Sequence, residues 1–193
     1  MVYQIKVTLD YSKPPIWRRL LVQPKISFMD LHYIIQGAMG WENAHLFMFY
    51  DKSGYNGLKI GVPYDDDFYE EDIVEADKML VNELLKVPKD SCIYEYDFGD
   101  GWRHIIVLEK ILEDIILPKA ICIKGTGACP PEDCGGMGGY YGMVAALNNP
   151  KDPESENYRE WLGLEEYEKW DPAAFELDEA NSGIQMYLSD SNY

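Results

Sequence analysis

The stretch "YDFGDGWRH", residues 96–104, combines carboxylates, a tryptophan and a histidine in one short segment. An Asp-Gly pair such as Asp100-Gly101 is the strongest short-range signal for a two-residue hairpin turn. With that turn, Asp97 faces His104 across the hairpin. A carboxylate beside an imidazole raises the pKa of the histidine and selects its tautomer, which suits proton transfer or metal binding. Asp97 and His104 are therefore the candidate catalytic residues.

The alternative for this pair is purely structural, because a polar cross-strand pair contributes under about 1 kcal/mol and needs no chemical role. The alternation of side chains along each strand decides which residues share a face. One face is expected to be core and holds Tyr94, Tyr96, Phe98, Ile105 and Val107, while the other holds Glu95, Asp97, Trp102, His104 and Ile106. Trp102 and Asp100 are therefore expected at a polar binding site on the second face.

A second candidate segment is "CIKGTGACPPEDCGGMGGY", residues 122–140. Its prolines and glycines indicate a loop held in one shape. We expect this loop to fold over the hairpin and to bring Glu132 or Asp133 toward His104, because charged groups on a covered face need partners. A loop that only covers an open sheet edge is the alternative.

The cysteines of this segment, Cys122, Cys129 and Cys134, lack the two-residue spacing of common zinc sites, so no metal is expected there. A zinc site would need a fourth ligand such as His104. The acid-rich stretch 63–72 is expected to be a solvated loop, because it lacks the fixed glycine and terminal glutamate of a calcium loop.

The chain carries 17 basic and 34 acidic residues, a formal net charge of -17. Binding along a nucleic-acid backbone requires clustered Lys and Arg, so this composition argues against a nucleic-acid partner. Arg18 and Arg19 form the one notable basic pair and stay candidates for local binding. No apolar run is long enough for a membrane span, and the first residues lack a signal peptide, so a cytoplasmic location without membrane contact is expected.

Hydrophobic periodicity predicts the elements that position these residues. Residues 3–11 and 16–23 read as two strands, and helix 27–39 follows, opened by Ser27 and Asp30 as a capping box. Two further strands, a short helix around 76–85, the hairpin and C-terminal helices complete the pattern. These elements predict an α+β fold, with a mixed or antiparallel sheet of about five to seven strands, a helix across one face and C-terminal helices.

The chain is expected to form one domain over residues 1–193. Within it we expect a sheet-and-helix core at 1–113, the Gly/Pro/Cys loop at 114–139 and a helical part at 140–193.

Five motifs together resemble the Ri-plasmid open-reading-frame-three-like family, also labelled TnpR-like transposon passenger proteins. They are "PPIWRRLLV", "LHYIIQGAMGWENAHLFMF", "YEYDFGDGWRHIIVLEKI", "CPPEDCGGMGGY" and "WDPAAFELDEAN", and they span nearly the whole chain. The resemblance implies an association with plasmids or mobile elements and carries no established activity. Through their motifs, Trp41 and His45 join the candidate binding residues.

Two function classes follow from these observations. The leading hypothesis is a non-enzymatic binding module of unknown function that needs no cofactor and contacts a protein partner through exposed aromatic side chains. The rival is a metal-dependent, hydrolase-like enzyme, in which Asp97, His104 and the Glu132-Asp133 pair converge on a divalent cation that activates water. If these side chains meet in space, the metal-dependent enzyme is favoured over the protein-binding module.

Overall fold

The computed structural model describes residues 1–63, 73–165 and 168–190, so the acid-rich stretch lies almost wholly outside the described residues. The strands are β1 (Val2–Leu9), β2 (Trp17–Val22), β3 (Phe47–Asp51), β4 (Lys59–Gly61), β5 (Ile73–Glu75), β6 (Ser91–Tyr96), β7 (Trp102–Leu112) and β8 (Ala120–Thr126). The helices are α1 (Phe28–Met39), α2 (Val81–Leu84), α3 (Gly136–Leu147), α4 (Ser155–Leu162) and α5 (Leu177–Asp190). The 3-10 turn Gly54–Asn56 connects β3 to β4.

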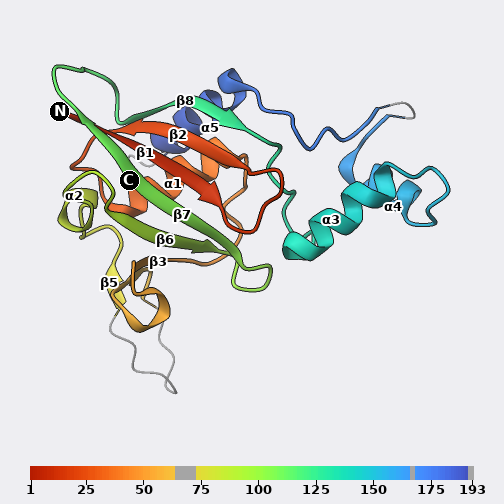
Figure 1. Cartoon of the computed structure of the whole chain (residues 1–193), viewed down its shortest axis with the longest axis horizontal. Helices are drawn as coiled ribbons and strands as arrows, with labels where there is room; N and C mark the ends of the chain where they lie inside the picture. Colours follow the sequence, from red (N-terminus) through yellow and green to blue (C-terminus); the bar gives the residue numbers. More distant parts are fainter. Residues whose placement is uncertain (64–72, 166–167, 191–193) are drawn as a thin grey trace.

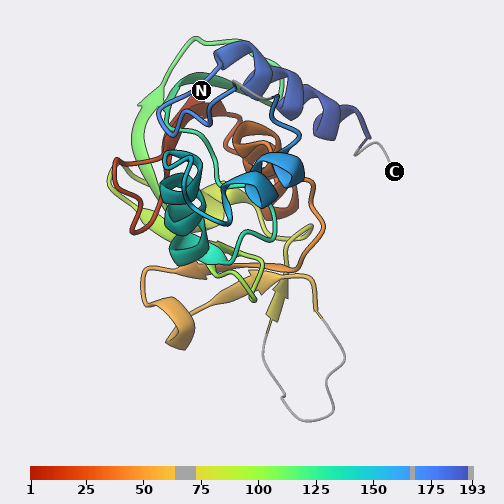
Figure 2. The ribbon, with the colours of Figure 1, turned by 90° about the vertical axis from the view of Figure 1, so that its right-hand side faces the viewer.

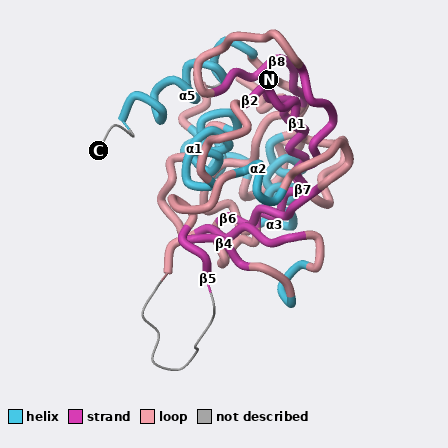
Figure 3. Tube along the Cα trace, turned by 90° about the vertical axis from the view of Figure 1, so that its left-hand side faces the viewer, coloured by secondary structure: helices cyan, strands magenta, loops and turns pink. Residues whose placement is uncertain are grey.

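The described strands form one sheet in the order β5-β4-β3-β6-β7-β1-β2-β8. All neighbours are antiparallel except β4 and β5, which run parallel. The sheet curves around α1, as Figure 3 shows, and α3 and α4 lie beyond the end of the sheet where β6 turns into β7 (Figure 1). The α+β fold with a mixed sheet is therefore confirmed. None of the described helices combines the length and the apolar character that a membrane crossing requires.

The described sheet has eight strands, above the expected five to seven, because two segments that were not predicted to be strands pair at its edges. One of them is β5, which is only three residues long. The other is β8, which pairs with β2 inside the segment expected as the Gly/Pro/Cys loop. The side chain of Asn181 on α5 bonds the backbone of Cys122 twice, accepting from its N at 2.8 Å and donating to its O at 3.0 Å. Cys122 is thus a strand residue rather than a loop residue.

Helix α1 forms where its local signals predict it. Ser27 Oγ accepts a hydrogen bond from Asp30 N at 3.0 Å, and the Asp30 carboxylate accepts one from Ser27 N at 3.4 Å. The expected apolar face is buried throughout and comprises Phe28, Leu31, Ile34, Ile35 and Ala38. Asp30 is half-buried and pairs with Lys119 at 3.2 Å. The capping box thereby also ties the helix start to the chain just before β8.

Helix α5 packs directly across α1 (Figure 2). The two helices cross at Gly37 and Gly183, where a Cβ atom on either glycine would overlap the backbone of the other. This crossing sets the position of α5 relative to the sheet. It also places Tyr187 so that its hydroxyl donates to the backbone carbonyl of Trp41 at 2.8 Å.

The hairpin of β6 and β7 has a different register from the predicted one. Tyr94 faces His104 and Tyr96 faces Trp102, so residues 97–101 form the connection. This register differs from that of a two-residue turn by three positions. An odd shift moves every side chain of one strand to the opposite face. The predicted Asp97–His104 cross-strand pair is therefore wrong.

The longer connection is closed by Asp97 itself. Its carbonyl accepts from Gly101 N at 2.6 Å, its Oδ1 accepts from Gly99 N at 2.9 Å, and its backbone is left-handed with φ 55°. Aspartate tolerates this conformation better than most residues and often closes turns with its side chain. The resulting register buries Trp102 and His104 on the face of Tyr94 and Tyr96. Burial of four large side chains on one face outweighs the local preference for the two-residue turn.

Candidate metal centre

The ends of two neighbouring strands carry the first two residues of the site. His45 comes just before β3, and Asp97 comes directly after β6, which pairs with β3. Asp97 N donates to the carbonyl of Leu46 at 2.9 Å, so the two ends are tied together. Glu132 and Asp133 reach the same place from the connection between β8 and α3. The site is therefore assembled from three separate segments.

The imidazole of His45 lies at the centre of the group. Its Nε2 is 3.1 Å from Asp133 Oδ1, 3.9 Å from Asp97 Oδ2 and 3.9 Å from Glu132 Oε2. The ligand atoms of His45, Asp97 and Asp133 all lie within 4.8 Å of one another. Within the described parts of the chain, this is the one such group of three or more His, Cys, Asp or Glu residues. We call these three residues the metal triad, with Glu132 beside it.

Two atoms of the site are buried without any hydrogen-bond partner: His45 Nε2 and Glu132 Oε2. The short approach of Asp133 to His45 lacks hydrogen-bond alignment and leaves Nε2 unsatisfied. An unpartnered buried carboxylate oxygen is costly, and neighbouring carboxylates repel one another. A divalent cation held between the imidazole and the carboxylates would remove both costs.

Tyr96 and the backbone of Glu42 hold the Glu132 carboxylate in place. Glu132 Oε1 accepts from Tyr96 Oη at 2.9 Å and from Glu42 N at 2.8 Å. Burial, and next the Glu132 carboxylate, raise the pKa of Tyr96 well above its ordinary value, so its hydroxyl stays protonated and donates. With Oε1 occupied twice, Oε2 is the oxygen that faces His45.

Trp41 and Asp100, both expected as binding residues, hold the loop that carries Glu132. Trp41 is buried and donates from Nε1 to the carbonyl of Pro130 at 3.0 Å. Asp100 Oδ2 accepts from Gly135 N at 3.0 Å. Gly136 has a φ of 66°, and a Cβ atom there would collide with the backbone carbonyl of Asp100. The absence of a side chain at Gly136 thus lets the loop lie against the hairpin turn.

His104 is a core residue and takes no part in the site. It is fully buried beside the rings of Trp41 and Tyr94, with centroids 5.2 and 5.3 Å away, and burial lowers its pKa to about 3. The loop does fold onto the hairpin as expected, but Glu132 and Asp133 meet His45 instead of His104. Trp102 is also fully buried and faces Tyr96 across the hairpin, so it lies in the core and not at the expected polar binding site.

The two adjacent arginines point to opposite faces of the sheet. Arg18 is buried on the side of α1, where it bonds the carbonyl of Ala38. Arg19 makes two bonds to the Glu109 carboxylate, at 2.6 and 2.8 Å. The alternation of strand β2 thus splits the basic pair, and the two side chains form no common patch.

The three cysteines of the predicted loop do not assemble a zinc site among the described residues. Burial raises the pKa of the Cys134 thiol to about 12 and that of Cys129 still further. The alternative zinc set of Cys122, Cys129, Cys134 and His104 is not brought together among the described residues.

The sequence indicated the three carboxylates of the site but assigned His104 to them, whereas the structure places them at His45. His45 stood among the binding candidates, without a role. The available signal was its position at the start of the strand-like segment "HLFMFYD", close in the sequence to the motif residue Trp41. Only the pairing of that strand with β6 shows that His45 and Asp97 end at the same edge.

Comparison with known proteins places the chain among uncharacterised relatives. A sequence model of the plasmid pRiA4b ORF-3-like proteins matches residues 1–179. The uncharacterized protein y4hQ of Sinorhizobium fredii is 33% identical over 184 residues, which cover 95% of this chain and 90% of that protein. The crystal structure of MM3350, a protein of unknown function from Methanosarcina mazei Go1, superposes with a TM-score of 0.76 at 34% identity, over 92% of this chain and 95% of that one. This chain belongs to the plasmid pRiA4b ORF-3-like family.

Proposed function

We propose that this protein binds one divalent transition-metal ion through the metal triad of His45, Asp97 and Asp133. The observation that carries the proposal is the pair of buried, unpartnered atoms, His45 Nε2 and Glu132 Oε2, which lie 3.9 Å apart. The proposal departs from the leading expectation of a protein-binding module without a cofactor and takes up the divalent cation of the rival hypothesis. It replaces His104 by His45 as the imidazole that serves it.

The donor set favours a particular class of ion. One imidazole nitrogen with carboxylate oxygens suits Zn²⁺, Fe²⁺ or Mn²⁺, whereas Ca²⁺ and Mg²⁺ prefer oxygen ligands alone. The two triad carboxylates balance the charge of one divalent ion. We therefore expect Zn²⁺ and Mn²⁺ to bind more tightly than Mg²⁺ and Ca²⁺.

Titration of EDTA-treated protein with ZnCl₂ and MnCl₂ in a calorimeter tests the proposal. The D133N variant is expected to lose about 100-fold or more in affinity, since losing a ligand exceeds the 10–100-fold typical of residues that only orient ligands. The Asp133 side chain is 71% exposed, so this change leaves the fold intact.

The matched control for that titration is E160Q. Glu160 is an exposed residue of α4, and the variant removes the same unit of charge away from the site. It is expected to bind like wild type. If D133N and E160Q bind Zn²⁺ and Mn²⁺ with equal affinity, the triad is not a metal site. The same conclusion follows if wild type binds Zn²⁺ and Mn²⁺ no more tightly than it binds Mg²⁺.

The Y96F variant is expected to weaken Zn²⁺ or Mn²⁺ binding by about tenfold, within the range for residues that orient ligands. Tyr96 Oη donates to Glu132 and also accepts from Ala44 N at 2.9 Å, next to His45. Its loss therefore loosens two sides of the site. Parallel urea unfolding of the metal-free variant separates this effect from general destabilisation; unchanged affinity would contradict the positioning role.

A second candidate function is hydrolysis by metal-activated water. Catalytic metal sites keep three protein ligands and an open position, and the metal triad supplies three. Asp133 and His45 are both solvent-accessible, so water can reach an ion held there. Glu132 Oε2, buried beside the triad, stands where a base would accept a proton from such a water.

The E132Q variant separates the two functions. If the protein is a hydrolase, metal-loaded wild type cleaves p-nitrophenyl acetate or bis(p-nitrophenyl) phosphate, and E132Q slows this turnover by about 100-fold or more. Zn²⁺ binding by E132Q should fall far less than in D133N. No turnover by the loaded wild type on either substrate would count against this second candidate and leave the metal-binding proposal standing.

A further inference from the structure

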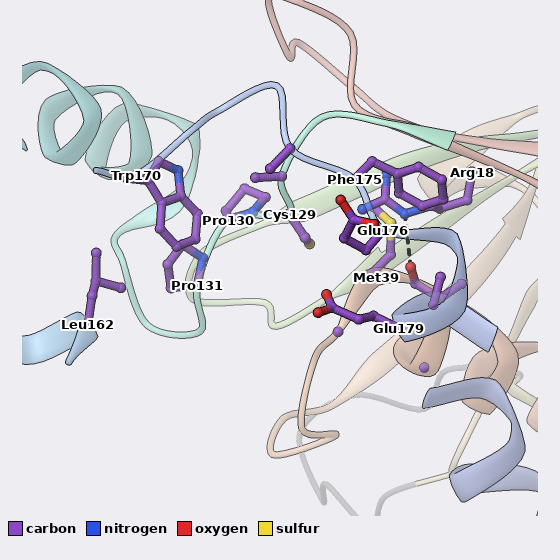
Figure 4. Close-up of a pocket in the computed structure, with 16 residues that line it drawn as sticks. Arg18, Met39, Cys129, Pro130, Pro131, Leu162, Trp170, Phe175, Glu176 and Glu179 are labelled. Atoms are coloured by element: carbon purple, nitrogen blue, oxygen red, sulfur yellow. Dashed lines mark hydrogen bonds between the residues drawn. The ribbon is translucent and has the colours of Figure 1, made fainter. Parts of the chain in front are cut away.

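A cavity of about 360 Å³ lies between the C-terminal end of α1, the loop before Glu132 and the chain leading into α5. Figure 4 shows Trp170 at one side of it and Arg18 beneath Phe175 at the other. Its lining is mostly apolar, with Met39, Cys129 and two prolines among the contacts. Arg18 is the one cation among the lining residues, and the size falls within the range of small-molecule sites.

The guanidinium of Arg18 is buried and bonded almost wholly to backbone carbonyls. Nε donates to Ala38 O at 2.9 Å, and Nη1 donates to the carbonyls of Trp17, Thr126 and Gly127 at 3.0–3.1 Å. Nη2 donates to no described residue, and the Phe175 ring covers the guanidinium at 4.5 Å from its centroid. Nη2 of Arg18, whose side chain is held in place by backbone carbonyls, is therefore available to a ligand.

The charge of Arg18 has no counter-ion among the described residues, because no carboxylate lies within ion-pair distance of it. Its side chain is almost fully buried, at 4% exposure. Carbonyls at the C-terminal end of α1 offset part of the charge through the helix dipole. Burial still lowers the pKa of Arg18, which marks a cation that is incompletely compensated. An anion in the cavity would complete the compensation.

We propose that this cavity binds a small monocarboxylate with an apolar or aromatic body. The carboxylate accepts from Arg18 Nη2, and the body packs against Trp170 and Phe175. A single guanidinium balances one negative charge, while Glu176 and Glu179, which also line the cavity, repel a doubly charged group such as phosphate. The proposal does not depend on the metal triad.

Calorimetric titration of EDTA-treated protein with phenylacetate tests the proposal, with phenylacetamide as the uncharged counterpart. Phenylacetate is expected to bind at least tenfold more tightly than the amide, because a hydrogen bond to a charged group is worth roughly ten- to hundredfold in affinity. Inorganic phosphate is expected not to compete. Equal binding of acid and amide, or no binding of phenylacetate, would overturn the proposal.

Two variants locate the binding at this cavity. A174W adds a large side chain at an exposed position that lines the cavity, and A173W is its control at the adjacent exposed position outside the lining. A174W is expected to abolish phenylacetate binding, and A173W to keep it. R18M should also lose the preference for the acid, but its lost backbone bonds can unfold the protein, so the A174W result decides. Equal binding by A173W and A174W, or loss of binding in D133N, would place the ligand elsewhere.

Discussion

Between pH 7 and pH 4 the free energy of unfolding is expected to fall by about 6 kcal/mol through two buried histidines. Burial lowers the pKa of His32 to about 4 and that of His104 to about 3, from an ordinary 6.5. Below pH 6.5 the unfolded chain binds a proton at each imidazole, whereas the folded protein excludes it. The stability is therefore complete above pH 6.5 and is lost progressively until the folded pKa values are reached.

The surroundings of His32 show why the folded state keeps it neutral. Its Nε2 donates to Asn43 Oδ1 at 2.7 Å, and its Nδ1 accepts from the Tyr94 hydroxyl at 2.8 Å, while Tyr94 Oη accepts from Gln36 Nε2 at 2.9 Å. These partners assign the proton to Nε2. The ring also stacks on Phe47 with centroids 3.7 Å apart. A second proton would place a charge in this buried setting.

Urea unfolding at pH 7, 6 and 5 with EDTA present measures this effect. From pH 6 to pH 5, where most carboxylates stay ionised, wild type is expected to lose about 2 kcal/mol. The H104F variant removes one of the two proton sites and should lose about half as much. A pH dependence equal in both proteins would show that His104 does not titrate as a buried neutral group.

Replacing Gly183 by alanine is expected to cost about 3 kcal/mol of stability, the upper end of the usual range for overpacking. The new Cβ atom would overlap the carbonyl of Gly37, and backbone atoms cannot rotate away as a side chain can. Helix α5 must then shift from α1, which also disturbs the contact of Tyr187 with Trp41. The G37A variant should behave in the same way, because its Cβ would meet the Gly183 backbone.

The control for these variants is G142A. Gly142 lies within helix α3, and a Cβ atom there meets nothing within 4 Å. Alanine is the better helix former by about 0.5–1 kcal/mol, so G142A is expected to be slightly more stable than wild type. Urea unfolding of all variants compares them directly. A loss in G183A of less than about 1 kcal/mol would mean that the two helices tolerate a wider crossing.

Local sequence signals are sufficient to predict the parts of this protein that depend on neighbours along the chain. Helix α1 is the best example, because Ser27, Asp30 and the apolar spacing from Phe28 to Ala38 act within a few turns. The alternating strand β1 is another, with Ile5, Val7 and Leu9 buried on one face. The class of fold and the family followed from the same local patterns and motifs.

The hairpin register, the edge strands and the identity of the candidate site histidine depend on long-range contacts. The Asp100-Gly101 signal is local, but burying Trp102 and His104 beside Trp41 involves residues far apart in the chain and outweighs it. Strand β8 likewise depends on β2 on one side and on Asn181 from α5 on the other. Strand pairing and a loop held against the hairpin bring together the three chain segments of the metal triad. The spacing of these residues in the sequence therefore does not indicate how close they lie in space. Residue types indicate which chemical groups are available, whereas long-range packing determines which of those groups lie close together.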